Sequence, residues 1–186
     1  TLLDIGCGWG ATIMRAVEKY DVNVIGLTLS ENQKQHIETN RFPNIDTTRS
    51  MEVRLQPWED FEGKVDRIVS IEMFEHMRNY QILMQRIRSW LKPGGQLFVH
   101  IFAHRTLMYP YETEGEDNWM GRHFFTGGLM PAADTLLHFQ QGLSLQQRWL
   151  LDGTHYEKTS NHWLANQDAN RDTVMPILRQ AYGDAA

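Results

Sequence analysis

The sequence contains a single cysteine, Cys7, among its 186 residues. One cysteine excludes an intrachain disulfide and suits a protein of the reducing cytoplasm. No apolar run approaches the roughly 18 residues that a membrane-spanning helix requires, so no transmembrane segment is expected. Positive charge is also scarce. A net charge of −5 gives no overall attraction to nucleic acid or to an anionic membrane, and nucleic acid is not an expected partner.

Repeats, low-complexity tracts and linkers are missing as well, which predicts one domain over residues 1–186. Apolar runs alternate with amphipathic stretches along the chain. Strands are predicted at residues 2–6, 23–28, 51–56, 65–71, 96–102 and 144–151. Helices are predicted at residues 11–20, 30–41, 79–91 and 129–141, with one or two more in 159–182. This order predicts an α/β fold, with a mostly parallel sheet and helices on both faces.

Two of these helices carry more detailed signals. Ser30 followed by Gln33 has the spacing of a capping box, so Ser30 is the expected N-cap of helix 30–41. In helix 79–91, the expected buried face consists of Ile82, Leu83, Ile87 and Trp90. The aromatic-rich stretch 104–128 interrupts the alternation, and a long insertion of this kind is typically a lid or binding loop.

The first ten residues, TLLDIGCGWG, form an apolar strand that runs into glycines at alternate positions. Glycine reaches positive φ and lets the backbone approach a ligand closely, beside the N–H groups that open helix 11–20. A dinucleotide site needs Gly-x-Gly-x-x-Gly and an acidic residue about 20 positions later. Here the third glycine comes one residue early, and no acidic residue ends strand 23–28. With Asp4 on the strand, the pattern resembles motif I of class I S-adenosylmethionine-dependent methyltransferases, which have a Rossmann-like fold.

Two further segments strengthen this resemblance. The sequence GLTLSENQ, residues 26–33, resembles the second cofactor segment of the cyclopropane fatty acid synthase superfamily. The sequence QPWE, residues 56–59, follows the third strand, where such enzymes hold adenine. A packed core tryptophan is the other interpretation of Trp58. The resemblance implies S-adenosyl-L-methionine as cofactor, with contacts from Asp4, Gly6, Cys7, Gly8, Gly10, Thr28, Leu29, Ser30, Gln33, Gln56, Trp58 and Glu59.

Two carboxylates and an imidazole follow the fourth predicted strand in the sequence SIEMFEHM, residues 70–77. An amine can accept a methyl group only after it loses its proton, and His76 has the intrinsic pKa of a suitable base. Glu72 and Glu75 would attract the ammonium and stabilise the His76 cation that results. The segment therefore predicts a catalytic site at the cofactor edge of the sheet.

Together with Asn79-Tyr80, FFTGGLMP at 124–131 and His155-Tyr156, this segment resembles the coclaurine N-methyltransferase-like branch of that superfamily. The resemblance implies that Glu72, Glu75 and His76 surround the nitrogen of an amine substrate. It also implies an aromatic substrate pocket that includes Phe124, Phe125 and Met130. Ordinary core packing of the two phenylalanines is the alternative.

The parent synthases of the superfamily methylate an alkene in a phospholipid acyl chain. Resemblance to them implies a bound bicarbonate held at the positions of Cys7, Glu75 and His100. They typically have glycine where this chain has Glu72, and their bicarbonate-binding tyrosine falls near Leu164. The extra carboxylate favours an amine over a lipid acyl substrate. A cyclopropane synthase and a non-catalytic relative stay open as alternatives.

His100 is also interpretable as an ordinary histidine at a strand end. Its spacing from His104 is that of two helical metal ligands, but the two residues lead out of a strand and have no third ligand nearby, so no metal site is expected. The superfamily sheet has seven strands and only six are predicted. The chain is therefore expected to be a partial methyltransferase domain, truncated at both ends. The sequence does not indicate an oligomeric state.

Overall fold

The computed structural model describes residues 1–115 and 117–183. The chain divides into two compact units, Thr1–Leu145 and Gln146–Ala186. Across the described residues, no helix is long and apolar enough to cross a membrane.

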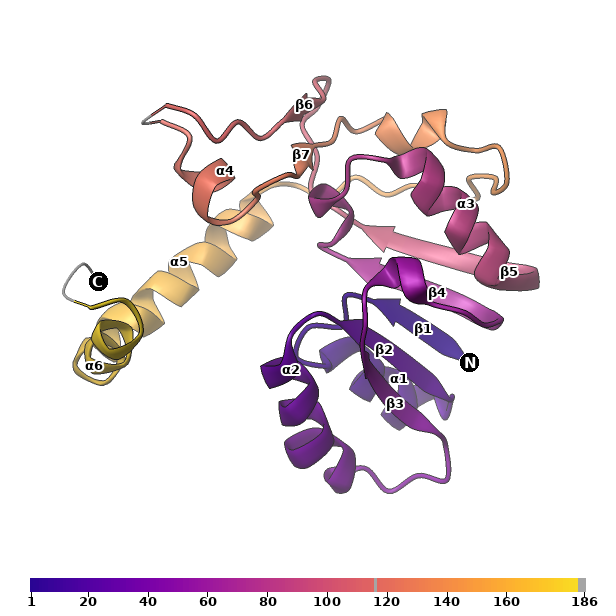
Figure 1. The fold of residues 1–186 in the computed structure, drawn as a ribbon, viewed down its shortest axis with the longest axis horizontal. Coiled ribbons are helices and arrows are strands. Elements are labelled where there is room, and N and C mark those ends of the chain that lie inside the picture. The colour runs from indigo at the N-terminus through magenta and orange to yellow at the C-terminus, as the bar shows by residue number, and fades with distance from the viewer. Residues whose placement is uncertain (116, 184–186) are drawn as a thin grey trace. The chain divides into compact units, whose positions relative to one another are not determined.

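A parallel sheet forms the centre of the first unit (Figure 1). Within the described part of the chain it has five strands: β1 (Leu2–Ile5), β2 (Val24–Thr28), β3 (Met51–Leu55), β4 (Val65–Ile71) and β5 (Leu91–His100). Their order is β3-β2-β1-β4-β5, so the chain builds outward from β1 first on one side and then on the other. Asp4 of β1 pairs in register with Gly26 on one side and Val69 on the other. Ligands of such sheets bind beyond the carboxyl ends of the strands at this reversal, next to β1 and β4.

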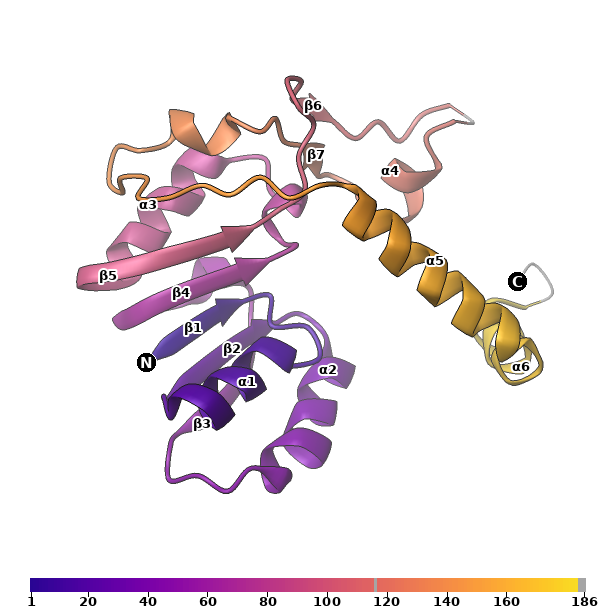
Figure 2. The same ribbon diagram turned by 180° about the vertical axis from the view of Figure 1, so that it is seen from behind.

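Helices cover both faces of the sheet, as predicted (Figures 1 and 2). One face packs against α1 (Ala11–Tyr20), whose Ile13 and Val17 are buried. Helix α2 (Glu31–His36) continues as a π-helical turn (Ile37–Arg41) and adds Ile37 to the same cluster. Helix α3 (Tyr80–Trp90) belongs to the larger cluster on the other face. The predicted α/β class with a parallel sheet is therefore confirmed.

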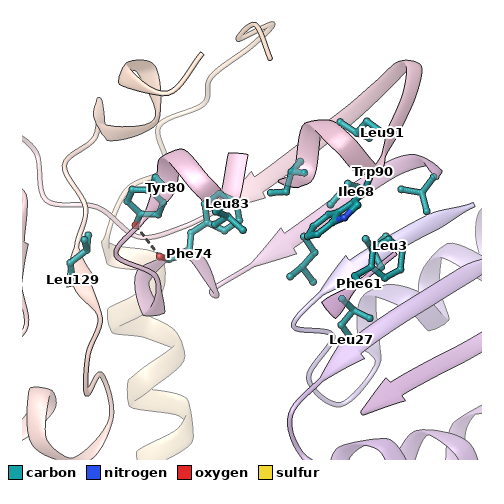
Figure 3. Packing of buried hydrophobic residues seen from close by; sticks show 13 residues of the cluster. Leu3, Leu27, Phe61, Ile68, Phe74, Tyr80, Leu83, Trp90, Leu91 and Leu129 are labelled. Atoms are coloured by element: carbon teal, nitrogen blue, oxygen red, sulfur yellow. Dashed lines mark hydrogen bonds between the residues drawn. The ribbon is translucent and has the colours of Figure 1, made fainter. Parts of the chain in front are cut away.

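The larger core cluster joins α3 to β1, β2 and β4 (Figure 3). Leu83, Ile87 and Trp90 lie one helical turn apart and are buried against sheet residues such as Leu3 and Ile68. Full burial of one such side chain contributes roughly 1.5–3 kcal/mol relative to exposure. Ile82 was expected on this face but is 49% exposed, because the buried stripe of α3 follows Leu83 and Ile87.

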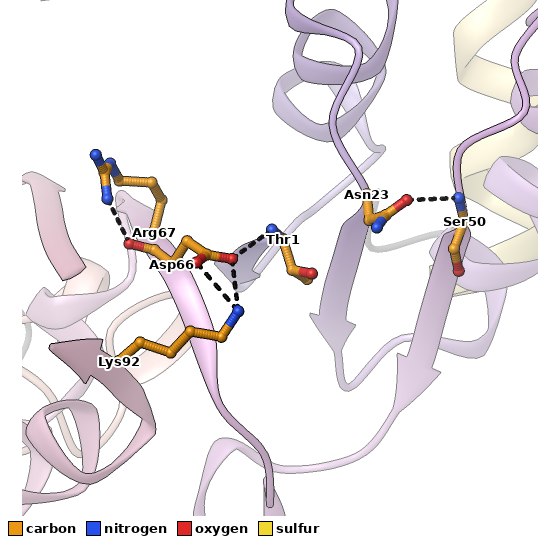
Figure 4. A network of polar contacts seen from close by, with 6 residues as sticks. All are labelled: Thr1, Asn23, Ser50, Asp66, Arg67 and Lys92. Carbon is orange, nitrogen blue, oxygen red and sulfur yellow. Dashed lines mark hydrogen bonds and ion pairs between the residues drawn. The ribbon is translucent and has the colours of Figure 1, made fainter. Parts of the chain in front are cut away.

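Polar contacts tie the strands together at their amino ends (Figure 4). The Asp66 carboxylate lies 2.7 Å from the Thr1 amino group and 3.0 Å from Lys92 Nζ, which links β4 to β5. The Ser50 N–H donates to Asn23 Oδ1 over 3.0 Å and joins β3 to β2. These contacts lie at the amino ends of the strands. A ligand is expected at the opposite edge of the sheet, beyond the carboxyl ends.

Two predicted elements are wrong. Residues 144–151 form no strand, because their alternating side chains have no buried face: Leu145 is 50% and Leu150 89% exposed. Residues 129–141 form no α-helix; they contain β7 (Leu129–Met130) and a 3-10 turn (Thr135–His138). The backbone at Pro131 and Ala133 bonds instead to His104, and β7 pairs antiparallel with β6 (Tyr109–Pro110). Long-range pairing overrides the local helical pattern here.

The remaining helices are shorter or longer than expected. In the described part of the insertion 104–128, a short helix, α4, spans Trp119–His123. The described part of the second unit contains α5 (Thr154–Ala169) and α6 (Arg171–Tyr182), which confirms the prediction of helices over 159–182 and extends it five residues toward the N-terminus. Strand β5 also begins earlier than predicted, directly after α3, because Leu91 pairs with Val65.

Candidate functional site

The three glycines after β1 all have positive φ, at 83°, 53° and 84° for Gly6, Gly8 and Gly10. A Cβ on Gly10 would lie 2.9 Å from Cγ1 of Ile37, and one on Gly6 would lie 3.1 Å from Cγ of Met73. A Cβ on Gly8 would meet no atom within 4 Å. Gly6 and Gly10 therefore pack against the protein itself, while Gly8 faces open space at the N-terminus of α1, where a ligand can approach the backbone.

Asp4 and Cys7 are both buried at this turn. Asp4 is 2% exposed, and burial raises the pKa of its carboxyl to about 7. The Cys7 N–H donates to the Leu27 carbonyl over 2.8 Å, which ties the turn to β2. A Cβ on Gly26 would lie only 2.8 Å from Cys7 Sγ, so the thiol fills space against β2. Burial and the charge of Asp4 raise the pKa of Cys7 to about 12, which makes it a packing residue and not a nucleophile.

The carboxyl end of β2 leads into the N-terminus of α2. Ser30 is the N-cap, as predicted, and its Oγ accepts from the Gln33 N–H over 3.3 Å. The expected reciprocal bond from the Gln33 side chain to Ser30 is not formed. Gln33 Oε1 instead accepts from Thr28 Oγ1 over 2.6 Å, while Thr28 Oγ1 accepts from the Ser30 N–H over 3.1 Å. Leu29 between them is 77% exposed.

The segment after β3 lies beside this corner. The Gln56 N–H donates to the Thr28 carbonyl over 3.1 Å. Trp58 opens a 3-10 turn (Trp58–Asp60) and is half-buried, with its ring edge-on to Trp90 at 6.4 Å between centroids. Glu59 is exposed. Trp58 therefore anchors the segment to the core and keeps part of its surface accessible.

The acidic segment bends sharply at the end of β4. Glu72 has a φ of +53°, a left-handed conformation that favours glycine, and its N–H donates to the His100 carbonyl over 3.0 Å. A short 3-10 turn (Phe74–His76) follows, braced by the Tyr80 hydroxyl, which donates to the Phe74 carbonyl over 2.9 Å (Figure 3). This bend places Glu72, Glu75 and His76 close together beyond the carboxyl ends of the strands.

Glu75 and His76 have opposite environments. Glu75 is 1% exposed, and burial, followed by the nearby charge of Glu72, raises the pKa of its carboxyl to about 8. A pKa raised this far favours the protonated form of the Glu75 carboxyl near neutral pH. His76 is exposed; partial burial lowers its pKa against the opposing effect of Glu72, which favours the neutral imidazole, the form that can take a proton.

An aromatic cluster borders His76. Phe125 is 7% exposed and lies at its centre, 5.2 Å from the His76 ring and stacked on Tyr111 at 4.8 Å between centroids. Phe102 meets Phe125 edge-on at 5.5 Å, and Phe124 is close by but 63% exposed. Phe125 thus packs as a core residue, and Phe124 presents its ring to solvent.

Sequence reasoning missed three contributors to this region. Tyr111 and Phe102 were not singled out, since nothing in the local sequence links them to Phe125. Gly128 packs on the backbone of Glu75 and His76, where any Cβ would collide with the Glu75 carbonyl. The glycine pair in the sequence FFTGGLMP is the one signal that could have indicated such a close approach. Met130 lies in β7 and is half-buried.

His100 lies at the end of β5, with Nδ1 2.7 Å from Glu72 Oε1. His104 is engaged elsewhere: its Nδ1 accepts from the N–H groups of Thr106 and Leu107 over 3.1 and 2.8 Å. Among the described residues, no three His, Cys, Asp or Glu side chains are grouped as metal ligands.

Comparisons with known proteins place the chain in one family. The chain is 40% identical over 189 residues to the S-adenosylmethionine-dependent methyltransferase UmaA of Mycobacterium tuberculosis, covering 95% of this chain and 65% of the relative. It is 35% identical over 182 residues to (S)-coclaurine N-methyltransferase of Thalictrum flavum, covering 96% and 50%. It is 38% identical over 195 residues to cyclopropane mycolic acid synthase 3 of M. tuberculosis, covering 99% and 68%.

Solved structures give the same result. Coclaurine N-methyltransferase bound to N-methylheliamine and SAH superposes with a TM-score of 0.88 at 35% identity, covering 98% of this chain and 55% of that one. Mycolic acid cyclopropane synthase CmaA1 complexed with SAH and CTAB superposes with a TM-score of 0.79 at 35% identity, covering 94% and 65%. The chain thus spans half to two thirds of the length of these relatives.

The family model for mycolic acid cyclopropane synthetase matches residues 1–183. The family resemblance noted in the sequence is therefore confirmed, and the chain belongs to the mycolic acid cyclopropane synthetase family.

Proposed function

We propose that the protein is an S-adenosylmethionine-dependent methyltransferase that methylates the nitrogen of an amine, and that residues 1–186 belong to one methyltransferase domain. The family match over residues 1–183 and the two SAH-bound relatives support the cofactor. The open space in front of Gly8 fits a ligand that contacts backbone N–H groups. We also propose a cytoplasmic location, which the single cysteine supports.

The residues around the glycine turn would hold the cofactor. Asp4, Gly6, Cys7, Gly8 and Gly10 form the turn. Thr28, Leu29, Ser30 and Gln33 form the corner after β2, and Gln56, Trp58 and Glu59 form the segment after β3. When bound, S-adenosylmethionine supplies a methyl group on a cationic sulfonium. The chain's own contribution is to hold the turn after β1, the corner after β2 and the segment after β3 at the ends of neighbouring strands. This is the positioning that such a transfer requires.

One observation carries the preference for an amine: the Glu72 carboxylate lies beside Glu75 and His76 at the bend after β4. A cationic ammonium entering this site would be attracted by Glu72 and would favour the ionised form of Glu75. The neutral His76 imidazole would accept the ammonium proton and free the nitrogen lone pair. Phe124, Phe125 and Met130 would contribute apolar and aromatic surface to the amine's carbon skeleton, and an aromatic face also attracts a cation.

A cyclopropane synthase is the second candidate. Cys7, Glu75 and His100, which resemblance to those synthases implies as bicarbonate-binding positions, are all present. However, Glu72 Oε1 lies 2.7 Å from His100 Nδ1, so a carboxylate already approaches the histidine that an anion would need. This contact argues for the amine and against the acyl chain.

The deciding experiment offers the full-length protein two acceptors with labelled S-adenosylmethionine: a secondary benzylisoquinoline amine and vesicles of unsaturated phospholipid. We expect label in the amine. Label in the lipid alone would make the protein a cyclopropane synthase, and SAH binding without label in either acceptor would favour a non-catalytic relative.

Two variants of Glu72 sharpen the assay. Glu72→Gln removes the charge and keeps the size, and we expect it to weaken amine methylation at least tenfold. Glu72→Gly removes the same charge and also relieves the left-handed backbone, so it should lose amine methylation while the protein becomes more stable. Unchanged amine turnover in both variants would remove Glu72 from the proposed mechanism.

A further inference from the structure

The end of β5 and the bend after β4 meet at two residues. His100 is the last residue of β5 and pairs in register with Ile71, the last residue of β4. The next residue, Glu72, donates its N–H to the His100 carbonyl over 3.0 Å. Its left-handed backbone then brings the side chain back to His100, where Oε1 lies 2.7 Å from Nδ1. Backbone and side chain of Glu72 are thus both tied to the same histidine.

The two contacting atoms are buried although both side chains are about one third exposed. Within residues 1–115 and 117–183, neither atom forms an aligned hydrogen bond, so the close approach of Oε1 to Nδ1 is the polar contact that each of them has. A buried carboxylate oxygen without a nearby donor or cation costs free energy. His100 therefore favours the conformation in which Glu72 lies against β5.

That conformation matters for the rest of the site. Glu72 acts on both neighbours, since its charge raises the pKa of Glu75 and also raises the pKa of His76. Glu75 Oε2 is itself buried and has no hydrogen-bond partner in the described residues. Burial is the largest influence on the pKa of both residues, and the charge of Glu72 is a nearby influence that they share.

We propose that His100 is a positioning residue that holds the Glu72 carboxylate against Glu75 and His76, and so prepares the site for a cationic acceptor. The proposal rests on the proposed amine methylation. In it, His100 does not touch the acceptor and acts through Glu72. The second candidate function would instead have His100 contact a bound anion directly.

Two substitutions in the full-length protein test this role. His100→Asn keeps an N–H donor near the position of Nδ1, whereas His100→Leu keeps comparable bulk and removes all polarity. We expect His100→Leu to raise KM for the amine at least tenfold, with a smaller change in kcat and unchanged SAH affinity. The acidic limb of its pH profile should move to lower pH, because His76 loses the charge that raises its pKa. His100→Asn should restore most of the wild-type behaviour.

A second readout needs no acceptor. The infrared C=O stretch of the protonated Glu75 carboxyl, assigned by subtracting the spectrum of Glu75→Gln, reports the titration of this group. Its midpoint should fall in His100→Leu, since Glu72 moves away, and stay near the wild-type value in His100→Asn. If His100→Leu leaves this midpoint unchanged, or lowers only the yield of folded protein, the positioning role is overturned.

The two readouts separate this proposal from the one on which it rests. A wild-type protein that methylates no amine refutes the proposed function through the activity assay. The infrared midpoint then still decides whether His100 controls Glu72, and an unchanged midpoint refutes that claim whatever the acceptor is.

Discussion

Thr28 and Gln33 are joined side chain to side chain, with Thr28 Oγ1 donating to Gln33 Oε1 over 2.6 Å. Thr28 is 5% exposed at the end of β2, and Gln33 lies in the first turn of α2, so the bond fixes where the Gln33 amide points. The same hydroxyl accepts the Ser30 N–H. One buried oxygen thus organises the corner that is proposed to contact the cofactor.

Replacement of this hydroxyl should therefore affect folding and binding together. Thr28→Val keeps the branched shape and removes both hydrogen bonds, so we expect a loss of about 1–3 kcal/mol in the free energy of unfolding. SAH affinity should fall as well, because Gln33 is no longer oriented. Urea unfolding and titration calorimetry measure the two effects. Thr28→Ser, which keeps the hydroxyl, is the matched control, and equal losses in both variants would contradict the role of the bond.

Gly8 and Gly10 differ in what a side chain would meet: one at Gly8 would enter the open space proposed for the ligand, and one at Gly10 would collide with Ile37. Alanine at either position adopts an unfavourable left-handed backbone at a cost of roughly 1–2 kcal/mol. Gly10→Ala also collides with Ile37, so its unfolding free energy should fall by about 1–3 kcal/mol more than that of Gly8→Ala. Gly8→Ala should instead show the larger loss of SAH affinity relative to its loss of stability. The reverse ranking would place the ligand elsewhere along the turn.

The raised pKa of Glu75 predicts a definite pH dependence of stability. The unfolded carboxyl ionises near its ordinary pKa of 4.5, whereas the folded one ionises near about 8, so between these values the folded state binds the extra proton. The contribution of this group to the free energy of unfolding is fully present below pH 4.5 and is lost as pH rises through about 8. Between these values the free energy of unfolding falls by up to about 1.4 kcal/mol per pH unit.

Glu75→Gln isolates this effect, since it removes the titration of residue 75. The Asp4 carboxyl, whose pKa is also raised by burial, is present in both proteins and does not contribute to the difference between them. We expect the variant and the wild type to be similarly stable at pH 4.5, with the variant gaining an advantage as pH rises toward 8. Chemical unfolding at three pH values in this range measures the difference. A difference that is independent of pH would mean that Glu75 titrates normally.

Substitution of Gly128 tests how closely the aromatic segment approaches the bend after β4. Its backbone does not have positive φ, so alanine meets no backbone strain there, yet the new Cβ would collide with the Glu75 carbonyl. We expect Gly128→Ala to destabilise the protein by about 1–3 kcal/mol and to weaken acceptor binding more than SAH binding. Gly127→Ala is the contrasting variant: its Cβ meets open space, but its φ of +81° strains the backbone, so stability should fall with little change in acceptor binding.

Local sequence patterns correctly predicted helix α1 and the parallel sheet. The bounds of α1 agree with the prediction, because an amphipathic run there follows a glycine turn and packs on one face. The parallel sheet followed from the alternation of strands and helices. The alternating stretch 144–151 failed because alternation makes a strand only where one face is buried, and Leu150 is 89% exposed.

In the candidate site, too, residues that are close in sequence could be predicted, whereas contacts between distant segments could not. Glu72, Glu75 and His76 are close in sequence, so one segment was enough to suggest them. The contact between Glu72 and His100 depends on the pairing of β4 with β5 at Ile71 and His100, which strand order decides. The stacking of Tyr111 on Phe125 depends on the path of a long insertion. Neither relationship has a signature within a short window of sequence.

The left-handed backbone at Glu72 also bears on how such enzymes diverge. A glycine would fit this bend without strain, and two of the four glycine codons become glutamate codons by one base change in the middle position. A single mutation can therefore add or delete the carboxylate beside Glu75 and His76 while the left-handed bend is kept. On the proposed role of Glu72, this one step would change which methyl acceptor the site favours.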